Sequence, residues 1–321
     1  MARNDELKEL AWKRLWADHW FGRLFGGGLL LGLCGSAVNT VLRGILGRLG
    51  VQSWFEYAGT VAQNWQDVTT PVPNLTPEYM SQASSSTVLT LFFSFIMTGI
   101  ASYGAAVILR KCVANDEKEW LGEAFGGFKN PFGMMWLQLR YWLIWFAYGL
   151  VAFFVPGLVC GLGYPFVKDL PMMQLALAVG VGTTACLCWV TWILCIPFYR
   201  YRYLWLVKAE HPDWGAGQCI RFCKTLTEGH KMESFRLDCS YWKPITLLML
   251  ALAGAATIGS LAVLFKDSGL LLSALALVAF VALSGSLVGS VVLGQYISVG
   301  QGFLYRNLKD GQTTEQNERN E

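Results

Sequence analysis

The residues best able to do chemistry lie in one polar stretch, 221–244, within an otherwise apolar chain. A tyrosine-rich segment with two arginines precedes it. Grouped guanidinium and ammonium side chains are suited to binding an anionic group. The sequence therefore predicts such a site, with four basic contact residues and one acidic residue as a structural polar anchor. They are Arg200, Arg202, Lys231 and Arg236, with Asp238 as the anchor.

Asp238 also has a purely structural interpretation. A carboxylate just before a long apolar run can cap a helix or pair with a nearby cation. The partners within reach along the sequence are Arg236, Lys243 and the 200–202 segment. On this interpretation Asp238 ties a short helix to the end of a longer one, and it takes no part in catalysis.

No catalytic, cofactor or metal site is predicted. The nine cysteines are an odd number and lie mainly in or beside apolar runs, so they do not suggest a disulfide framework. Three of them fall in one apolar run, at 186, 188 and 195, but this spacing matches no zinc pattern and no histidine is near. The three histidines, His19, His211 and His230, are far apart and none is paired with a nucleophile.

Composition places these residues in a membrane protein. Hydrophobic residues make up 54% of the 321, and the mean hydropathy is +0.40. Much of the apolar content falls in blocks of roughly 20 residues or more, the length that crosses about 30 Å of hydrocarbon. A net charge of +3 gives no argument for a nucleic-acid partner. The anionic group at the basic cluster is therefore expected to be a lipid head group.

The expected fold is an all-α, polytopic membrane bundle of about six transmembrane helices with interfacial amphipathic helices. Residues 1–310 are predicted to form a single integral membrane domain, and 311–321 a disordered cytoplasmic tail. A polar, proline-containing connection is expected over 47–87. The predicted spans are 25–46, 88–109, 140–164, 172–199, 244–265 and 269–297.

Short amphipathic segments are predicted between the spans. Trp12, Trp16 and Trp20 are spaced four apart and would line one ridge of a helix, either on the inner leaflet or packed against the bundle. A second helix is expected to begin at Asp213 as N-cap and to end near Gly229. Pro156 is expected to kink the third span.

The lysines and arginines predict the orientation. Of the 25, all but four fall in segments that six spans place on one side. The exceptions are Arg43, Arg48, Lys168 and Lys266. Since cytoplasmic loops are enriched in these residues, both termini are predicted to be cytoplasmic.

The order of segments also predicts an internal repeat. An amphipathic segment, an outgoing helix and a returning helix follow one another three times, so three hairpin units are expected. The alternative is that any hairpin protein with basic inner loops has this pattern.

The polar stretch carries a resemblance to a known family. With YRYRYLWLVKAEHPDW before it and GQYISVGQGFLYRNL near the end, it resembles the bacterial integral-membrane family catalogued as domain of unknown function 975. His211 departs from the family's usual Asn, and Lys224 or Thr225 from its usual Ser. The matching positions are Pro212, Leu226, Gly229, Lys231, Phe235, Leu237, Asp238, Ser240, Phe303 and Tyr305.

The resemblance implies a bacterial cytoplasmic membrane protein and no particular reaction. The family is related to the membrane region of some glycerophosphodiester phosphodiesterases, whose soluble catalytic domain has no counterpart in this sequence. We therefore expect no enzymatic activity. The expected function is a structural or stress-protection component that binds lipid at its cytoplasmic face, with homo-oligomers allowed. The alternative is a permease or exporter-like transporter of an apolar or amphiphilic solute.

Overall fold

The computed structural model describes residues 2–16, 19–48, 77–116, 118–167, 171–264 and 269–320, and over these ranges it is helical with no strand. The predicted connection over 47–87 lies mostly outside the described residues. The α-helices are α1 (Ala2–Trp16), α2 (Trp20–Arg48), α4 (Pro77–Ala114), α5 (Trp120–Ala124), α6 (Pro131–Val167), α7 (Met172–Tyr201), α8 (Leu204–Glu210), α9 (Ala216–Thr227), α10 (Lys231–Ser240), α11 (Trp242–Leu264) and α12 (Gly269–Asn320), with a 3-10 turn, η2 (Phe125–Lys129).

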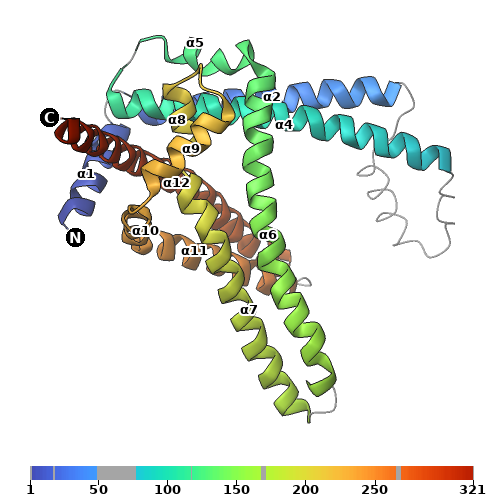
Figure 1. The fold of residues 1–321 in the computed structure, drawn as a ribbon. Helices are drawn as coiled ribbons and strands as arrows, with labels where there is room; N and C mark the ends of the chain where they lie inside the picture. The colour runs from blue at the N-terminus through green and yellow to red at the C-terminus, as the bar shows by residue number, and fades with distance from the viewer. Residues whose placement is uncertain are drawn as a thin grey trace.

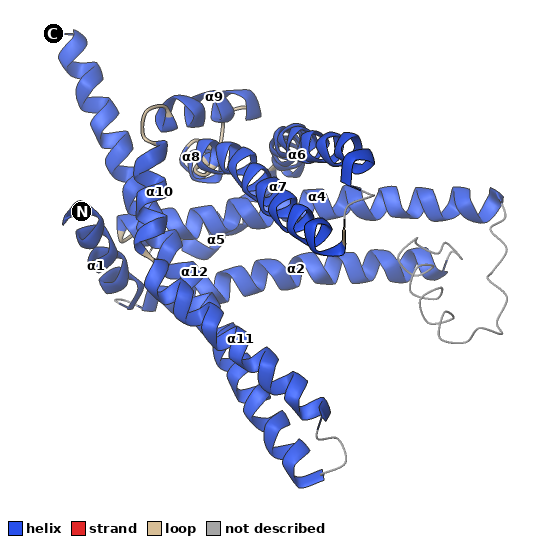
Figure 2. Cartoon of the chain, turned by 90° about the horizontal axis from the view of Figure 1, so that it is seen from below, coloured by secondary structure: helices blue, strands red, loops and turns tan. Residues whose placement is uncertain are grey.

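Three long helical hairpins radiate from one hub (Figures 1 and 2). Their helices pair as α2 with α4, α6 with α7, and α11 with α12. The hub consists of α1, α5, η2, α8, α9 and α10 together with the adjoining ends of the long helices, called here the inner ends. Both termini of the chain lie on the hub side in Figure 1, away from the tips of the hairpins.

The main hydrophobic core lies in the hub. It combines residues from α1, α4, α6, α8, α9, α10 and α12, and its central leucines have no exposed surface. These central leucines are Leu137, Leu204, Leu226 and Leu237. By contrast, large apolar side chains farther out on the hairpins face outward, for example Phe154 at 69% and Leu247 at 71% exposure. A helix that presents apolar residues to its surroundings is suited to lipid.

Five helices have the length and apolar composition to cross a membrane over the described residues. Their apolar stretches are Trp20–Val38, Val88–Ala114, Pro131–Val159, Gly180–Glu210 and Leu283–Gly311. The fifth predicted span, 244–265, corresponds to α11, whose described apolar part is the shorter Trp242–Ala251. Over its described residues the chain is thus all-helical and compatible with a multi-pass membrane protein.

The third span begins earlier than the sequence predicted. α6 starts at Pro131, nine residues before the expected start at 140, and it continues without interruption past Pro156. Asn130 caps it, since its Oδ1 accepts a hydrogen bond from the Gly133 amide at 2.9 Å. Proline suits the first helical position because the amide it lacks would have had no partner there. The Asn-Pro pair therefore marks the start of this helix.

Two glycines allow α4 to approach its neighbours closely. A Cβ atom on Gly99 would lie 2.9 Å from the Met134 carbonyl oxygen of α6, and one on Gly104 would lie 2.8 Å from the Ala124 carbonyl oxygen of α5. Both contacts are with backbone, which cannot rotate away. The α4–α6 and α4–α5 contacts therefore depend on these two positions lacking a side chain.

The tryptophan ridge predicted at the N-terminus is broken. α1 ends at Trp16, and Trp20 begins α2, where it is fully buried. α1 instead packs through Leu7, Ala11 and Leu15, which are spaced four apart and buried in the hub. Trp12 and Trp16 remain about half exposed on its other face.

Two other boundaries differ from expectation. α9 begins at Ala216, and Gly215 precedes it with its amide bonded to the Gln218 side chain at 2.9 Å, so Asp213 is not its cap. Residues 311–320 continue α12 as helix where a disordered tail was expected. Extending an existing helix is far easier than starting one, and no proline interrupts this polar stretch. Gly229, where α9 was predicted to end, lies two residues beyond the observed last residue of that helix, Thr227, and has a φ of +85°, a conformation that glycine adopts without strain.

Candidate functional site

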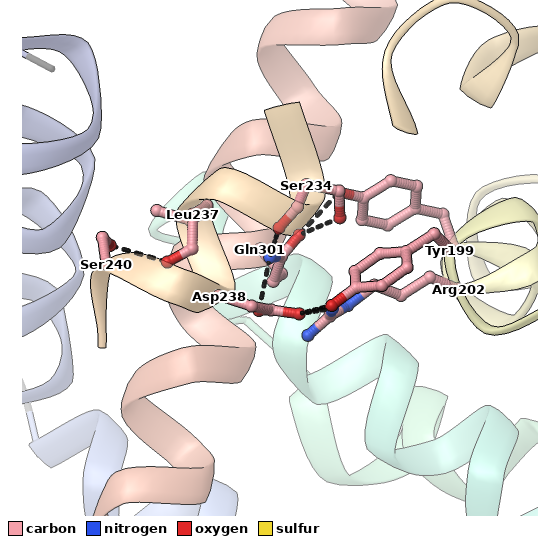
Figure 3. A network of polar contacts seen from close by, with 8 residues as sticks. Tyr199, Arg202, Ser234, Leu237, Asp238, Ser240 and Gln301 are labelled. Atoms are coloured by element: carbon pink, nitrogen blue, oxygen red, sulfur yellow. Dashed lines mark hydrogen bonds and ion pairs between the residues drawn. The ribbon is translucent and has the colours of Figure 1, made fainter. Parts of the chain in front are cut away.

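A network of polar side chains joins the inner end of α7 to α10 and α12 (Figure 3). Asp238 on α10 lies at its centre and forms an ion pair with Arg202, which directly follows α7. The Tyr199 hydroxyl donates to Asp238 Oδ2 at 3.1 Å, and Gln301 Nε2 of α12 donates to Oδ1 at 2.8 Å. The side chains of the ion pair are only 16% and 20% exposed. The carboxylate thus accepts from three side chains and ties α10, which carries it, to the inner end of α7 and to α12.

Gln301 is the most fully engaged member. It is 4% exposed, and besides Asp238 its amide nitrogen donates to the Ser234 carbonyl at 3.1 Å. Its oxygen accepts from the Tyr203 hydroxyl at 2.7 Å and the Ser234 hydroxyl at 2.9 Å. A side-chain amide has two N–H donors and two acceptor lone pairs, so its capacity is used completely. Such a group fixes one register between α12 and α10.

Helical spacing explains why these residues meet. Ser234 and Asp238 are four apart on α10, which puts them on the same face, toward Gln301. Leu237 and Tyr241 are also four apart and are buried in the hub core. The Arg202 guanidinium lies 5.0 Å from the Phe198 ring and 5.8 Å from the Tyr199 ring, which holds it over the end of α7.

The other three predicted contacts do not join this network. The Arg200 carbonyl accepts from Thr227 of α9 at 3.0 Å, and its guanidinium lies 6.0 Å from the Tyr201 ring. Lys231 is partly buried at the start of α10. Arg236 is exposed, because two helical residues turn it about 200° away from Asp238. Of the four, Arg202 alone has a contact here with Asp238.

Burial controls the chemistry of the α9 face of the hub. Cys219 and Cys223 have no exposed surface, and burial raises the pKa of the Cys223 thiol to about 12. The Cys223 thiol lies 3.6 Å from the Arg200 carbonyl oxygen. Since the thiolate is the reactive form, this cysteine is a packing residue at neutral pH.

A buried lysine fixes the turn before α9. Lys208 is 4% exposed, and its ammonium donates to the carbonyls of Pro212 at 2.6 Å and Trp214 at 2.7 Å. The His211 ring stacks on Trp214 with centroids 3.9 Å apart. These contacts give Lys208 and His211 structural roles in a compact turn.

A cavity of about 310 Å³ lies beside the network. It is formed by α2, α4, α8, α12 and the residues after α7. Besides Tyr203 and Trp205, four polar side chains line it, and the other lining residues are apolar. The four are Arg202, Gln295, Ser298 and Gln301. Over the described part of the chain, no group of three or more His, Cys, Asp or Glu side chains is arranged to hold a metal ion.

Gln301, Ser234 and Tyr203 were not predicted as site residues. One sequence signal was present: Gln295, Ser298 and Gln301 are spaced three apart in an apolar helix and so form a polar stripe. Nothing in the sequence indicates which helix this stripe faces. Ser234 and Tyr203 carry no signal of their own, because buried hydroxyls are common in helical cores.

Comparison of the chain with known protein families, curated proteins and solved structures finds no match. The geometry of the hub and of its cavity is therefore the basis for a functional assignment.

Proposed function

We propose that the protein crosses the bacterial cytoplasmic membrane six times, as three repeated hairpin units with both termini in the cytoplasm. Each hairpin follows one or more short hub helices: α1, α5 with η2, and α9 with α10. The 25 lysines and arginines fall mainly in the segments that belong to the hub or adjoin it. A basic layer on the cytoplasmic side agrees with the usual distribution of charge across membranes.

The function we assign is that of a structural or stress-protection component that binds anionic lipid at its cytoplasmic face. The observation that supports it is the contrast between a hub tied by polar contacts and hairpins that expose apolar side chains. Asp238 joins α7, α10 and α12, while Arg110 of α4 donates to the Ala209 carbonyl at 2.8 Å and so ties the first hairpin to α8. We assign no enzymatic reaction, because Asp238 is engaged by three donors and is poorly placed to act as a base.

Retention of anionic lipid by the purified protein tests this assignment. In native mass spectrometry, the wild type should retain phosphatidylglycerol in preference to phosphatidylcholine. The double variant Lys231→Gln, Arg236→Gln removes two basic groups, each contributing about 1 kcal/mol, so affinity should fall roughly 30-fold. Lys129→Gln, an exposed lysine at the end of η2, is the control. Equal retention by the double variant and the control would contradict binding at this face.

The alternative is a permease or exporter-like transporter of an amphiphilic solute. The cavity beside Arg202 favours it, since the cavity lies between two hairpins and next to a charged network. Proteoliposomes loaded with a fluorescent fatty acid analogue distinguish the two functions. Protein-dependent efflux above that of empty liposomes supports transport, and efflux equal to that of empty liposomes supports the structural role.

A further inference from the structure

The cavity beside Arg202 has one charged side chain and several polar ones in its lining. Arg202, Gln295, Ser298 and Gln301 contribute its polar groups. Arg202 reaches Asp238 through Nη1, and a guanidinium carries five N–H donors in a planar fork, so a second acceptor can be bound at its other edge. Gln295 adds a neutral amide donor to the same cavity.

A second cavity, of about 480 Å³, continues from the first along the α2–α4 hairpin. The two share Gly28 and Ala105 in their linings, which makes them neighbours. The second is lined by glycine, alanine, serine and threonine with Leu31 and Met97, and its lining contains no charged residue. Thr98 donates its hydroxyl to the Ser94 carbonyl at 2.7 Å, so this polar group is satisfied within its own helix.

The combined shape fits an amphiphile. Its charged residue, Arg202, lies at the inner ends of the helices, where a head group would lie at the membrane surface, and its uncharged part follows α2 away from the hub. Gly28 and Ser36 are eight residues apart, which is about 12 Å along a helix. Binding sites of this kind typically combine a few hundred cubic ångströms of apolar space with a small number of placed polar groups.

We propose that this compound cavity binds one chain of an acidic amphiphile, with its carboxylate or phosphate on Arg202 and Gln295 and its acyl chain between α2 and α4. The proposal rests on the lipid binding proposed above and places one ligand at a defined site. Arg202 then has two roles: one edge of its guanidinium holds Asp238, and the other holds the head group.

A substitution that fills the uncharged part tests the site without disturbing the network. A Cβ on Gly28 meets nothing within 4 Å, so Gly28→Leu extends into the space that both cavities share. Gly26→Leu is the matched control: it lies on the same helix, its Cβ is equally free, and it lines neither cavity. Both variants should keep the wild-type unfolding temperature within a few degrees.

The probes are oleate, dioleoyl-phosphatidylglycerol and dioleoyl-phosphatidylcholine, each added to delipidated protein and measured by native mass spectrometry. We expect Gly28→Leu to bind the acidic probes at least tenfold more weakly than Gly26→Leu does. Oleate alone binding to the wild type would identify a free fatty acid, and phosphatidylglycerol binding a phospholipid chain. Arg202→Gln should weaken binding of both acidic probes at least tenfold. Arg236→Gln, outside the cavity, should weaken it only by the roughly fivefold that one basic group of the cytoplasmic face contributes.

Three results would overturn the proposal. If Gly28→Leu and Gly26→Leu bind the acidic probes equally, the proposed cavity site is wrong, while the proposal of lipid binding at the cytoplasmic face is unaffected. If the wild type binds phosphatidylcholine as tightly as phosphatidylglycerol, the site does not select an acidic head group. If the wild type binds none of the three probes, both the cavity site and the proposed lipid binding are wrong.

Discussion

At the scale of single residues, the hub is held by the Asp238 carboxylate, whose charge is balanced by an ion pair and hydrogen bonds. Asp238 accepts from Arg202, Tyr199 and Gln301, and Gln301 has no capacity left over. A partly buried ion pair contributes little by itself, because desolvation offsets the attraction. Removing Asp238 alone is nevertheless costly, because the buried donor groups of its partners are then left without an acceptor.

Replacing Asp238 should therefore destabilise the protein clearly. In Asp238→Ala, three donors lose their acceptor, so we expect the free energy of unfolding to fall by about 2–3 kcal/mol. Asp238→Asn retains one acceptor oxygen and should lose about half as much. The measurement is reversible denaturant unfolding in detergent micelles. Asp213→Ala, at an exposed turn position, is the control, and an Asp238→Ala loss no larger than this control would refute the anchor role.

At the scale of elements, the hub depends on close backbone approach as much as on side chains. α4 contacts α2, α6, α5, η2 and α8, which makes it the most widely connected helix of the first hairpin. Gly99 and Gly104 lie on it where neighbouring carbonyls come nearest. An added methyl group there must move backbone, which cannot adjust as a flexible side chain does.

Replacing a helical glycine by alanine has two effects: the added methyl group can crowd a neighbour, and alanine favours the helix more than glycine does. Two positions on neighbouring helices separate these effects. Gly99→Ala should lower the free energy of unfolding by about 1–3 kcal/mol, because its Cβ would lie 2.9 Å from the Met134 carbonyl oxygen. Gly149→Ala on α6, where a Cβ meets nothing within 4 Å, should be neutral or stabilising by up to about 1 kcal/mol. Unfolding temperatures in detergent measure both. Shifts of the same sign and size would show that the α4–α6 approach is not tight.

At the scale of the whole molecule, orientation is the property to test. Cys239 is exposed on α10 of the hub, whereas Cys223 is buried with a pKa raised to about 12. The folded pKa lies above neutral, so the Cys223 thiol stays protonated between pH 7 and 9, and raising the pH within this window does not activate it.

Labelling with a membrane-impermeant maleimide should therefore report the side of the hub. Single-cysteine proteins retaining Cys239 should react in inverted vesicles and not in intact spheroplasts. Those retaining Cys223 should react in neither until the protein is denatured. Labelling of Cys239 from outside intact spheroplasts would reverse the proposed orientation.

Much of the helical layout could be predicted because the long helices appear in the sequence as long apolar blocks. Apolar blocks of about 20 residues indicate helices directly, and α7 and α11 begin within two residues of their predicted starts. The buried face of α9, with Cys219, Cys223 and Leu226, follows from its helical period. Boundaries that depend on polar capping, such as Asn130 before α6, are less visible, because hydropathy does not record them.

The site was predictable only in part, because its partners are far apart along the chain. Arg202 and Asp238 were candidates, but Gln301 is 63 residues beyond Asp238 and meets it through tertiary packing. Helical period gives the face on which each residue lies, and it does not give the helix that this face meets. The basic residues between 200 and 236 predicted a single cluster. The helical period of α10 instead places Arg236 on a different face from Asp238.

The continuity of α12 has a mechanical consequence. It runs unbroken from Gly269 to Asn320, and the network holds it at Gln301, 32 residues from its first residue. At 1.5 Å per residue, the arm beyond this pivot is about 48 Å long. A rotation of about 10° at the pivot then displaces the far tip of the arm by about 8 Å. The contacts that hold α12 in the hub, those of Gln301 among them, therefore set by leverage where the outer tip of the third hairpin lies.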